Sequence, residues 1–404
     1  MADNRDYYNQ SNYSRSNTRP NNTRPGGSGR GNGPRKKKSG MSGGKVAIFI
    51  FEFAIIAALI FVLIKFVIPA TGTSGGSGKL TVVDNSNLKP EEIGISEEVQ
   101  KMTEEGGAMS GYLNIALFGI DSTSSKVKAL EKGFRSDCIM IASINLETGD
   151  VRLCSVYRDT YLKTGEEDGQ SYFQKCNAAY AIGGGNKAVS MLNSNLDLDI
   201  TSWIAVSYRG LADAIDSLGG IYIDVDESEI SHLNAYQAAV CEVLNEEYIP
   251  LTETGYQKVN GMQAAGYCRI RYTAGDDFKR AERQREVLKA LMDAAHAADS
   301  DKLVAAFNKV SGSTISSMDG KTLLQFVENI AKYNIVAEGG FPDEDHRITG
   351  TMGAKGSCVI PTTLSESVTE LHRFLFNDTE YVPSETVESY SEIVKSDSLK
   401  YLGR

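Results

Sequence analysis

The sequence lacks the side-chain patterns of several common metal and hydrolase sites. Neither a G-x-S-x-G nor an H-E-x-x-H motif occurs. The glycines at 183–185 are not followed by the G-K-[ST] of a phosphate-binding loop, so we do not expect a nucleotide substrate. The four histidines have no partner at metal or triad spacing, and each is expected to lie at the surface. They are His232, His296, His346 and His372.

Cysteine also indicates no metal site. None of the six cysteines is paired at a metal-type spacing, and several stand in apolar, strand-like runs. Burial as small hydrophobic side chains is therefore favoured, and a disulfide remains the alternative. The six are Cys138, Cys154, Cys176, Cys241, Cys268 and Cys358.

Aliphatic residues are almost missing from residues 1–45, which are rich in Asn, Ser, Gly, Pro and Arg. Such a composition cannot bury enough apolar surface to fold, so we predict a disordered tail. The tail has ten Lys or Arg against Asp3 and Asp6, a net charge of +8. The rest of the chain has 32 basic and 50 acidic residues, a net charge of −18, which argues against nucleic acid as a partner.

One long apolar run follows the tail. VAIFIFEFAIIAALIFVLI, residues 46–64, has Glu52 as its only charge, and a further short run extends it to 68. This length matches the bilayer core and predicts a transmembrane helix over 46–68, whereas a cleaved signal peptide normally has a shorter apolar region. Because positive charge stays inside, we expect a cell-membrane protein with a cytoplasmic tail and an extracellular body. Residues 69–112 would be the linker and an accessory segment.

Residues 113–298 have the pattern of a layered α/β domain. Apolar runs at 113–120, 138–145 and 151–157 predict three strands, the last two joined by the turn LETG. Helical and strand patterns then alternate as far as the strand IYIDV. We predict a mixed central β-sheet flanked by helices on both faces, because the early strands form a hairpin and the later ones use crossovers. Residues 299–404 are expected to form a helical extension and a flexible, acidic tail.

Arginine is concentrated in RIRYTAGDDFKRAERQ, residues 269–284. Four arginines flank a turn with two acids; they are Arg269, Arg271, Arg280 and Arg283, with Asp276 and Asp277 in the turn. The planar fork of arginine donors matches phosphate, so the cluster suggests a polyanionic ligand, and a solvated helix face is the alternative. A helix expected over 278–298 places Arg280, Arg283 and Gln284 on one face, one turn before its apolar stripe. That placement favours a binding site.

Acids stand near the ends of the predicted strands, beside a further arginine. They are Asp121, Asp137 and Asp159, with Arg158 next to the last. Carboxylates and phosphate-binding arginines belong together if a divalent cation bridges acid and phosphate oxygens, since Mg²⁺ prefers one or two carboxylates plus phosphates.

Six sequence blocks carry a resemblance to a known family. They are FGIDS from Phe118, RSDCIMIASIN from Arg135, SVYRDTYL from Ser155, KCNAAYAIGGG from Lys175, LGGIYIDV from Leu218 and RIRYTAGDDFKRAERQ from Arg269. In this order the chain resembles the LytR-CpsA-Psr family over roughly residues 113–295. Tyr157 stands where that family usually has proline, and Cys138 where threonine is common.

The resemblance implies an enzyme outside a bacterial membrane. Members transfer a glycopolymer, such as teichoic acid or capsular polysaccharide, from undecaprenyl pyrophosphate to the N-acetylmuramic acid of peptidoglycan through a phosphodiester. Mg²⁺ (or Mn²⁺) assists, and the family fold is a central sheet between helices with a hydrophobic groove for the polyprenyl chain. The implied partners are the lipid-linked glycopolymer, peptidoglycan and the membrane.

Site roles follow by position from the resemblance. Asp121 and Asp137 match the metal-holding acids, and five arginines match those lining the pyrophosphate: Arg158, Arg269, Arg271, Arg280 and Arg283. Lys175 and Gln284 also fall in the site blocks. Asp276, Asp277 or a metal-bound acid would be the general base, and that choice stays open. A polyprenyl-pyrophosphate phosphatase and a non-catalytic receptor or regulator for lipid-linked wall precursors are the alternative functions.

Overall fold

The computed structural model describes residues 80–85, 87–120, 130–271, 276–299, 302, 305–306, 309–310, 312–318 and 334–403. The chain divides into two units, Met1–Ser42 and Gly43–Arg404, and all described residues belong to the second. The predicted tail and the predicted transmembrane helix over 46–68 lie outside the described residues. Among the residues described, no helix is both long and apolar enough to span a bilayer.

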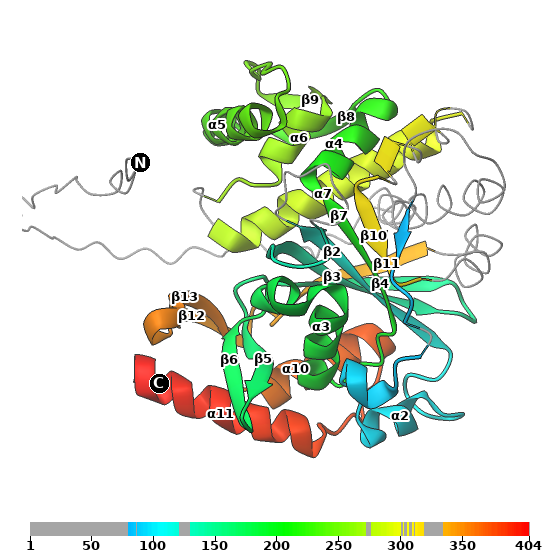
Figure 1. Ribbon diagram of the computed structural model, residues 1–404, viewed down its shortest axis with the longest axis vertical. Helices are drawn as coiled ribbons and strands as arrows, with labels where there is room; N and C mark the ends of the chain where they lie inside the picture. The colour runs from blue at the N-terminus through cyan, green and yellow to red at the C-terminus, as the bar shows by residue number, and fades with distance from the viewer. Residues whose placement is uncertain are drawn as a thin grey trace, which may run out of the picture. The chain divides into compact units, whose positions relative to one another are not determined.

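Seven strands form the central sheet, in the order β1-β10-β7-β2-β3-β4-β11 (Figure 1). Their bounds are β1 Thr81–Val82, β2 Tyr112–Ile120, β3 Ser136–Asn145, β4 Asp150–Val156, β7 Ser202–Ser207, β10 Thr314–Ser316 and β11 Asn334–Phe341. β2, β3 and β4 are antiparallel neighbours, whereas β7 runs parallel to β2 and β11 runs parallel to β4. The predicted mixed sheet is therefore confirmed, together with its first three strands.

Helices cover both faces of this sheet (Figure 1). One face is covered by η1 Pro90–Ile93, α2 Glu97–Thr103, α3 Ala178–Leu196 and α10 Leu364–Phe376, with α11 Glu385–Leu402 against α3 and α10. On the other face, α4 Tyr208–Ser217 and α7 Asp276–His296 lie over the sheet, α6 Gly261–Tyr267 packs on α4, and α5 Glu227–Leu244 packs on α6. The predicted arrangement of helices on both faces is confirmed.

The two faces of β2 differ in burial. Ala116, Phe118 and Ile120 are buried against the α3 side. The alternate residues Leu117 and Gly119 are only half-buried, because their face borders an apolar cavity under α4 and α7. A strand that read as uniformly buried therefore has one open face.

Helix α3 begins earlier than its pattern suggested. Glycines at 183–185 would ordinarily interrupt a helix, but α3 starts at Ala178 and continues through them with a bend at Gly183 and Gly184, whose backbone angles are not helical. A Cβ at Gly185 would lie 2.3 Å from the Trp203 ring, so only glycine lets the helix approach the sheet this closely. The glycines therefore mark a packing contact inside the helix.

The strand IYIDV is present as β8, Ile221–Val225, but it lies outside the central sheet. It pairs with β9, Gly255–Val259, in a separate antiparallel hairpin. Two more small sheets are β5 Tyr161–Glu167 with β6 Gln170–Lys175, and β12 Arg347–Thr351 with β13 Ser357–Pro361.

The C-terminal segment completes the fold. β11 lies beyond residue 298, the predicted end of the catalytic domain, and pairs along the whole of β4. The end expected to be a flexible tail forms α11, which buries Val387, Ser391, Val394 and Ser398. These positions recur every three or four residues, but two of them are serines, so the buried stripe looked polar in the sequence.

One histidine prediction is wrong. His372 is fully buried, with its ring 3.8 Å from that of Tyr381 and its Nε2 2.9 Å from the Leu196 carbonyl oxygen. It follows Val368 by four residues on the inward face of α10, so helical spacing places it in the core. All six cysteines are free; five are buried as expected, and Cys138 is half-buried.

Candidate functional site

The site forms where β3 begins, β4 ends and α7 starts. Arg158, just after β4, pairs with the buried carboxylate of Asp137 on β3. Its Nε lies 3.5 Å from Asp159 Oδ1 and 4.0 Å from Asp277 Oδ1. These three acids raise the pKa of the Arg158 guanidinium, against the opposing effect of its burial. Strand and helix ends thus bring together charges that are far apart in the sequence.

Asp277 is the acid most contacted by arginine. Its Oδ1 accepts Arg280 Nη2 at 2.8 Å and lies 3.9 Å from Arg271 Nε. Its Oδ2 is buried and has no hydrogen-bond partner among the residues that the structure describes. Burial raises the pKa of the Asp277 carboxyl despite the opposing charge of Arg280. Asp277 therefore has one oxygen held in place and one open to accept a proton.

Arg280 is 2% exposed, although it carries a full charge. Its Nη2 pairs with Asp277, whereas its Nε and Nη1 have no hydrogen-bond partner within the described part of the chain. A buried guanidinium with unused donors is costly unless a ligand supplies acceptors, so Arg280 is prepared to bind an anion.

Arginines line an open cavity of about 340 Å³ on one side of this cluster. Its lining consists of Gly133, Phe134, Arg135, Asp137, Arg158, Tyr236, Arg269 and Arg271. The Arg269 guanidinium lies over the rings of Tyr208 and Tyr236, at 5.1 and 5.8 Å from their centroids. Four arginines against one aspartate make this cavity strongly attractive to an anion.

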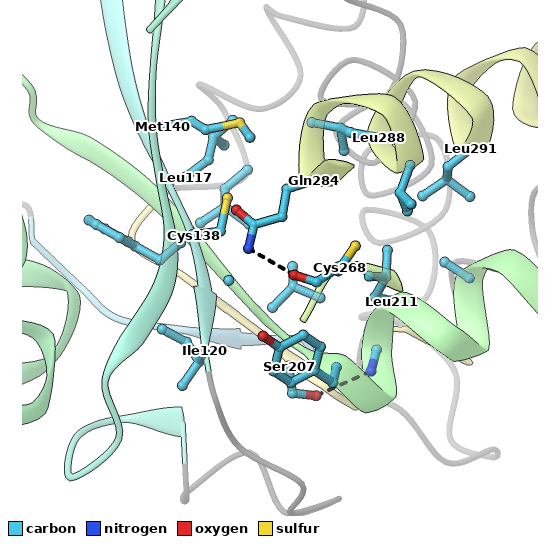
Figure 2. A pocket seen from close by; sticks show the side chains of 18 of the residues that line it. Leu117, Ile120, Cys138, Met140, Ser207, Leu211, Cys268, Gln284, Leu288 and Leu291 are labelled. Atoms are coloured by element: carbon cyan, nitrogen blue, oxygen red, sulfur yellow. Dashed lines mark hydrogen bonds between the residues drawn. The ribbon is translucent and has the colours of Figure 1, made fainter. Parts of the chain in front are cut away.

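An apolar cavity of about 140 Å³ lies on the other side, between the sheet and helices α4 and α7 (Figure 2). Leu288 and Leu291 of α7 face Leu117 and Met140 of the sheet across it. Gln284 lies at its edge, and its Nε2 donates to the carbonyl oxygens of Cys268 and Asp137, each at 3.4 Å. A smaller pocket shares Asp137 and Arg158 with the arginine cavity and Cys138 and Gln284 with the apolar one, and so links the two.

Seven of the residues proposed from the sequence come together here. They are Asp137, Arg158, Arg269, Arg271, Asp277, Arg280 and Gln284. Lys175 lies next to them, with its Nζ 3.3 Å from Asp159 Oδ1. Asp121 and the side chain of Asp276 lie outside what the structure describes, as does the turn at 272–275.

Arg283 lies apart from both cavities. Its Nε donates to Glu229 Oε1 at 2.6 Å and its Nη1 to the Ile270 carbonyl oxygen at 3.2 Å, and both charged side chains are buried. In this structure Arg283 therefore connects α7 to α5 and to the segment that carries Arg269 and Arg271.

Sequence reasoning missed four residues of the site and its support. Arg135 and Tyr236 line the arginine cavity, and Glu229 pairs with Arg283. Asn177 is fully buried behind Arg158, and neither polar atom of its side-chain amide has a partner among the described residues. Arg135 could have been found, because residues two apart on a strand share a face and Arg135 stands two before Asp137. Tyr236 and Glu229 lie in a helix without any chemical signature.

A metal site cannot be built from the described residues alone. Among them, no group of three His, Cys, Asp or Glu side chains is arranged to hold a metal ion. Asp137 offers the hard carboxylate oxygens that Mg²⁺ prefers, and it lies at the edge of the arginine cavity.

The comparison with known proteins identifies the class. Residues 80–354 match the LytR_cpsA_psr family, so the chain belongs to the LytR-CpsA-Psr family. It is 29% identical over 277 residues to "Biofilm regulatory protein A" of Streptococcus mutans, covering 60% of this chain and 64% of that one. It is 28% identical over 180 residues to "Polyisoprenyl-teichoic acid--peptidoglycan teichoic acid transferase TagU" of Enterococcus faecalis, covering 44% of this chain and 52% of that one.

A third relative is TagV of Bacillus subtilis, with the same transferase name, 27% identical over 230 residues and covering 55% of this chain and 54% of that one. The chain thus spans between half and two thirds of the length of these three relatives. Among solved structures, "TagT bound to LIIa-WTA" has a TM-score of 0.53 at 18% identity, covering 74% of this chain and all of that one. Protein gbs0355 from Streptococcus agalactiae has a TM-score of 0.53 at 21% identity, covering 73% of this chain and 94% of that one. These likenesses show the fold.

Proposed function

We propose that this chain transfers a glycopolymer from an undecaprenyl-pyrophosphate carrier to the N-acetylmuramic acid of peptidoglycan, forming a phosphodiester. The polymer would be a teichoic acid or a capsular or secondary wall polysaccharide. Support comes from the family and from two relatives named as teichoic acid transferases that use a polyisoprenyl-linked donor.

The observation that carries this proposal is the meeting of two unlike cavities. A polyprenyl pyrophosphate has a long apolar chain and a doubly charged head, and its binding requires an apolar space next to an anion site. The apolar cavity under α4 and α7 and the arginine cavity are linked by a small pocket that shares lining residues with both.

Within this function the arginines act electrostatically. Arg158, Arg269 and Arg271 bind the pyrophosphate oxygens, and the unpartnered donors of Arg280 stabilise the charge that develops as the bridging P–O bond breaks. Arg283, buried with Glu229, acts at a distance by fixing α7. Lys175 keeps Asp159 in place beside Arg158.

Asp277 is the general base in this proposal. Its unpartnered Oδ2 can accept the proton of the attacking sugar hydroxyl. The raised pKa of the Asp277 carboxyl makes the carboxylate a stronger base, as a general base requires. The donor phosphorus bonds to that hydroxyl oxygen, and the leaving prenyl phosphate takes the bridging oxygen.

Mg²⁺ (or Mn²⁺) belongs to the same proposal, with Asp137 and Asp121 as its ligands. The buried carboxylate of Asp137 beside the arginine cavity fits such an ion, since Mg²⁺ combines one or two carboxylates with substrate phosphates. When bound, the ion would neutralise part of the pyrophosphate charge. The proposed location is the cell membrane, with the site outside and residues 1–45 in the cytoplasm.

One assay tests the function. The full chain in detergent is incubated with a polyprenyl-pyrophosphoryl saccharide, a peptidoglycan oligomer and Mg²⁺, and the products are separated by mass. A saccharide joined to the oligomer through a phosphodiester is expected. Released phosphate would indicate a phosphatase, and tight binding without any product would indicate a receptor or regulator; either result contradicts the proposal.

A further inference from the structure

Three side chains from separate parts of the chain stack on one another beside the site. Tyr157 follows β4, Phe278 is in the first turn of α7, and Arg347 begins β12. The two rings meet edge to face with centroids 4.7 Å apart. The Arg347 guanidinium carbon lies 4.0 Å from the Phe278 centroid and 5.1 Å from that of Tyr157. We call these three residues the Arg347 stack.

Arg347 is held by aromatic faces and neutral oxygens. Its Nη1 donates to the Tyr157 hydroxyl at 3.0 Å and to the Pro342 carbonyl oxygen at 3.2 Å. Within the described part of the chain it has no ion pair with a carboxylate. A planar guanidinium can stack on one ring and bond to another at once, which an ammonium cannot do.

The two aromatic residues are covalent neighbours of the charged site. Tyr157 immediately precedes Arg158, and Phe278 immediately follows Asp277. Arg158 Nε and Asp277 Oδ1 lie 4.0 Å apart. Each ring is therefore anchored to the backbone segment that carries one of these two groups.

The backbone around the stack is tightly fixed. The Val359 amide of β13 donates to the Asp159 carbonyl oxygen at 3.0 Å. The Tyr157 amide donates to the Phe341 carbonyl oxygen at 3.1 Å. A Cβ at Gly340 would lie 2.2 Å from the Tyr157 hydroxyl oxygen, so no larger residue fits there. The β12–β13 hairpin is thus bonded to the segment that carries Arg158, and Arg347 extends that connection to α7.

We propose that Arg347 is a positioning residue, which sets the separation of Arg158 and Asp277 by stacking on Phe278 and bonding to Tyr157. The C-terminal hairpin then forms part of the working site although none of its side chains lines the two cavities. This inference rests on the proposed transfer function for its kinetic test, and on geometry alone for its structural test.

The kinetic test compares two variants of the full chain in detergent. Arg347→Met removes the guanidinium and keeps the stem, whereas Arg347→Lys keeps the charge and loses the planar fork. Misplacing reacting groups by about 1 Å can cost roughly 100-fold, so we expect kcat to fall by about 10- to 100-fold in both variants, with KM for the lipid donor changed less than about threefold. Lys400→Met, which removes a cation from the exposed ring of Tyr401 on α11, is the matched control and should keep wild-type kcat.

Two outcomes would overturn the inference. If Arg347→Lys has wild-type kcat, the side chain contributes only charge. If Arg347→Met and Phe278→Leu reduce kcat independently, so that the double variant shows the product of both losses, the two side chains do not act through one stack. We expect the double variant to be no slower than the worse single variant.

A structural readout separates this inference from the proposed function. Hydrogen exchange in Arg347→Met should become at least about fivefold faster at the first turn of α7 than in wild type, and unchanged in α11. If wild type makes no transfer product, the proposed function fails, and faster exchange at α7 still supports positioning by Arg347. Unchanged exchange at α7 in both Arg347 variants would refute it whatever the activity.

Discussion

Single residues of the site differ in what they contribute, and burial separates them. Arg280 is buried with two unused donors, Arg283 is buried with its charge paired, and Arg271 is partly exposed to the cavity. All three looked alike in the sequence. We expect Arg280 to affect the rate of the reaction, Arg283 the stability of the fold, and Arg271 the binding of the donor.

Arg280→Lys should abolish most of the transfer without unfolding the protein. Lysine keeps the charge next to Asp277, but its single nitrogen cannot place donors at the positions of the guanidinium Nε and Nη1, and loss of one such donor typically costs about 100-fold or more in kcat. The measurement is kcat in the transfer assay together with thermal unfolding. Arg373→Lys, an exposed pair with Glu370 on α10, is the control. Wild-type kcat in Arg280→Lys would show that its spare donors have no role.

Glu229→Gln should destabilise the fold. Its partner Arg283 has a side chain only 5% exposed, and an unpaired buried charge costs about 3–5 kcal/mol. Glutamine can still accept the Asp226 amide, so the helix cap is preserved. The free energy of unfolding in urea is the measurement. Glu282→Gln, in an exposed pair with Lys279, should change it little, and an equally small effect at Glu229 would contradict this account.

His372 should make stability depend on pH. Burial lowers the pKa of its imidazole, whereas the unfolded chain takes up a proton near pH 6.5. The unfolded state therefore binds more protons between the lowered folded pKa and about 6.5, and stability falls as the pH falls through that window. The free energy of unfolding of wild type and His372→Gln should be compared at pH 7.5 and 5.5.

The slope between these pH values should be weaker in His372→Gln than in wild type. His346 has the opposite sign, because its bond to Asp343 raises its pKa, so its contribution is present at low pH and is lost as the pH rises. Because His346 is present in both proteins, its contribution to the pH dependence of stability is the same in each and cancels in the comparison. Equal slopes in both would mean that His372 is not neutral in the folded state.

At the scale of elements, α4 and α7 act as the wall of the apolar cavity. Leu211 and Ala214 of α4 and Leu288 of α7 line it on one side, and Leu117 of β2 lines it on the sheet side. Natural cores rarely leave such a volume unfilled, so the gap indicates a ligand rather than imperfect packing.

Ala214→Phe should close that cavity. The added ring occupies part of the roughly 140 Å³ and competes with a prenyl chain, while the arginine cavity is unaltered. We expect affinity for a long-chain prenyl pyrophosphate to fall by at least about tenfold, with affinity for inorganic pyrophosphate unchanged, as measured by calorimetry. Ala239→Phe, on the exposed face of α5, is the control. Equal affinity of wild type and Ala214→Phe for the long-chain ligand would exclude this cavity as the chain site.

Across the whole molecule, local patterns predicted more than long-range pairings. Strands β2, β3 and β4 and helix α7 were readable from apolar periodicity, and the arginines of α7 from their spacing. β11 was missed because its partner β4 lies about 180 residues earlier, and no local signal announces such a pairing. Glu229 was missed for the same reason, since its role exists only through Arg283 on another helix.

Family resemblance and structure contribute different parts of the account. The blocks pointed to Asp137, Arg158 and the arginine cluster, which the fold brings together around two cavities. The structure adds the distinction between Arg280 and Arg283 and the involvement of the C-terminal hairpin. Membrane anchoring and the metal remain predictions from sequence and resemblance.

The most direct test of the central claim follows the phosphate next to the sugar. A lipid-linked saccharide labelled at that phosphate is given to the full chain in detergent with Mg²⁺ and a peptidoglycan oligomer. The account predicts that the label appears on the oligomer in a phosphodiester, with unlabelled prenyl phosphate as the second product, and that Arg280→Lys suppresses both. Label in a free sugar phosphate or in inorganic phosphate, or label that stays on the lipid, would contradict it.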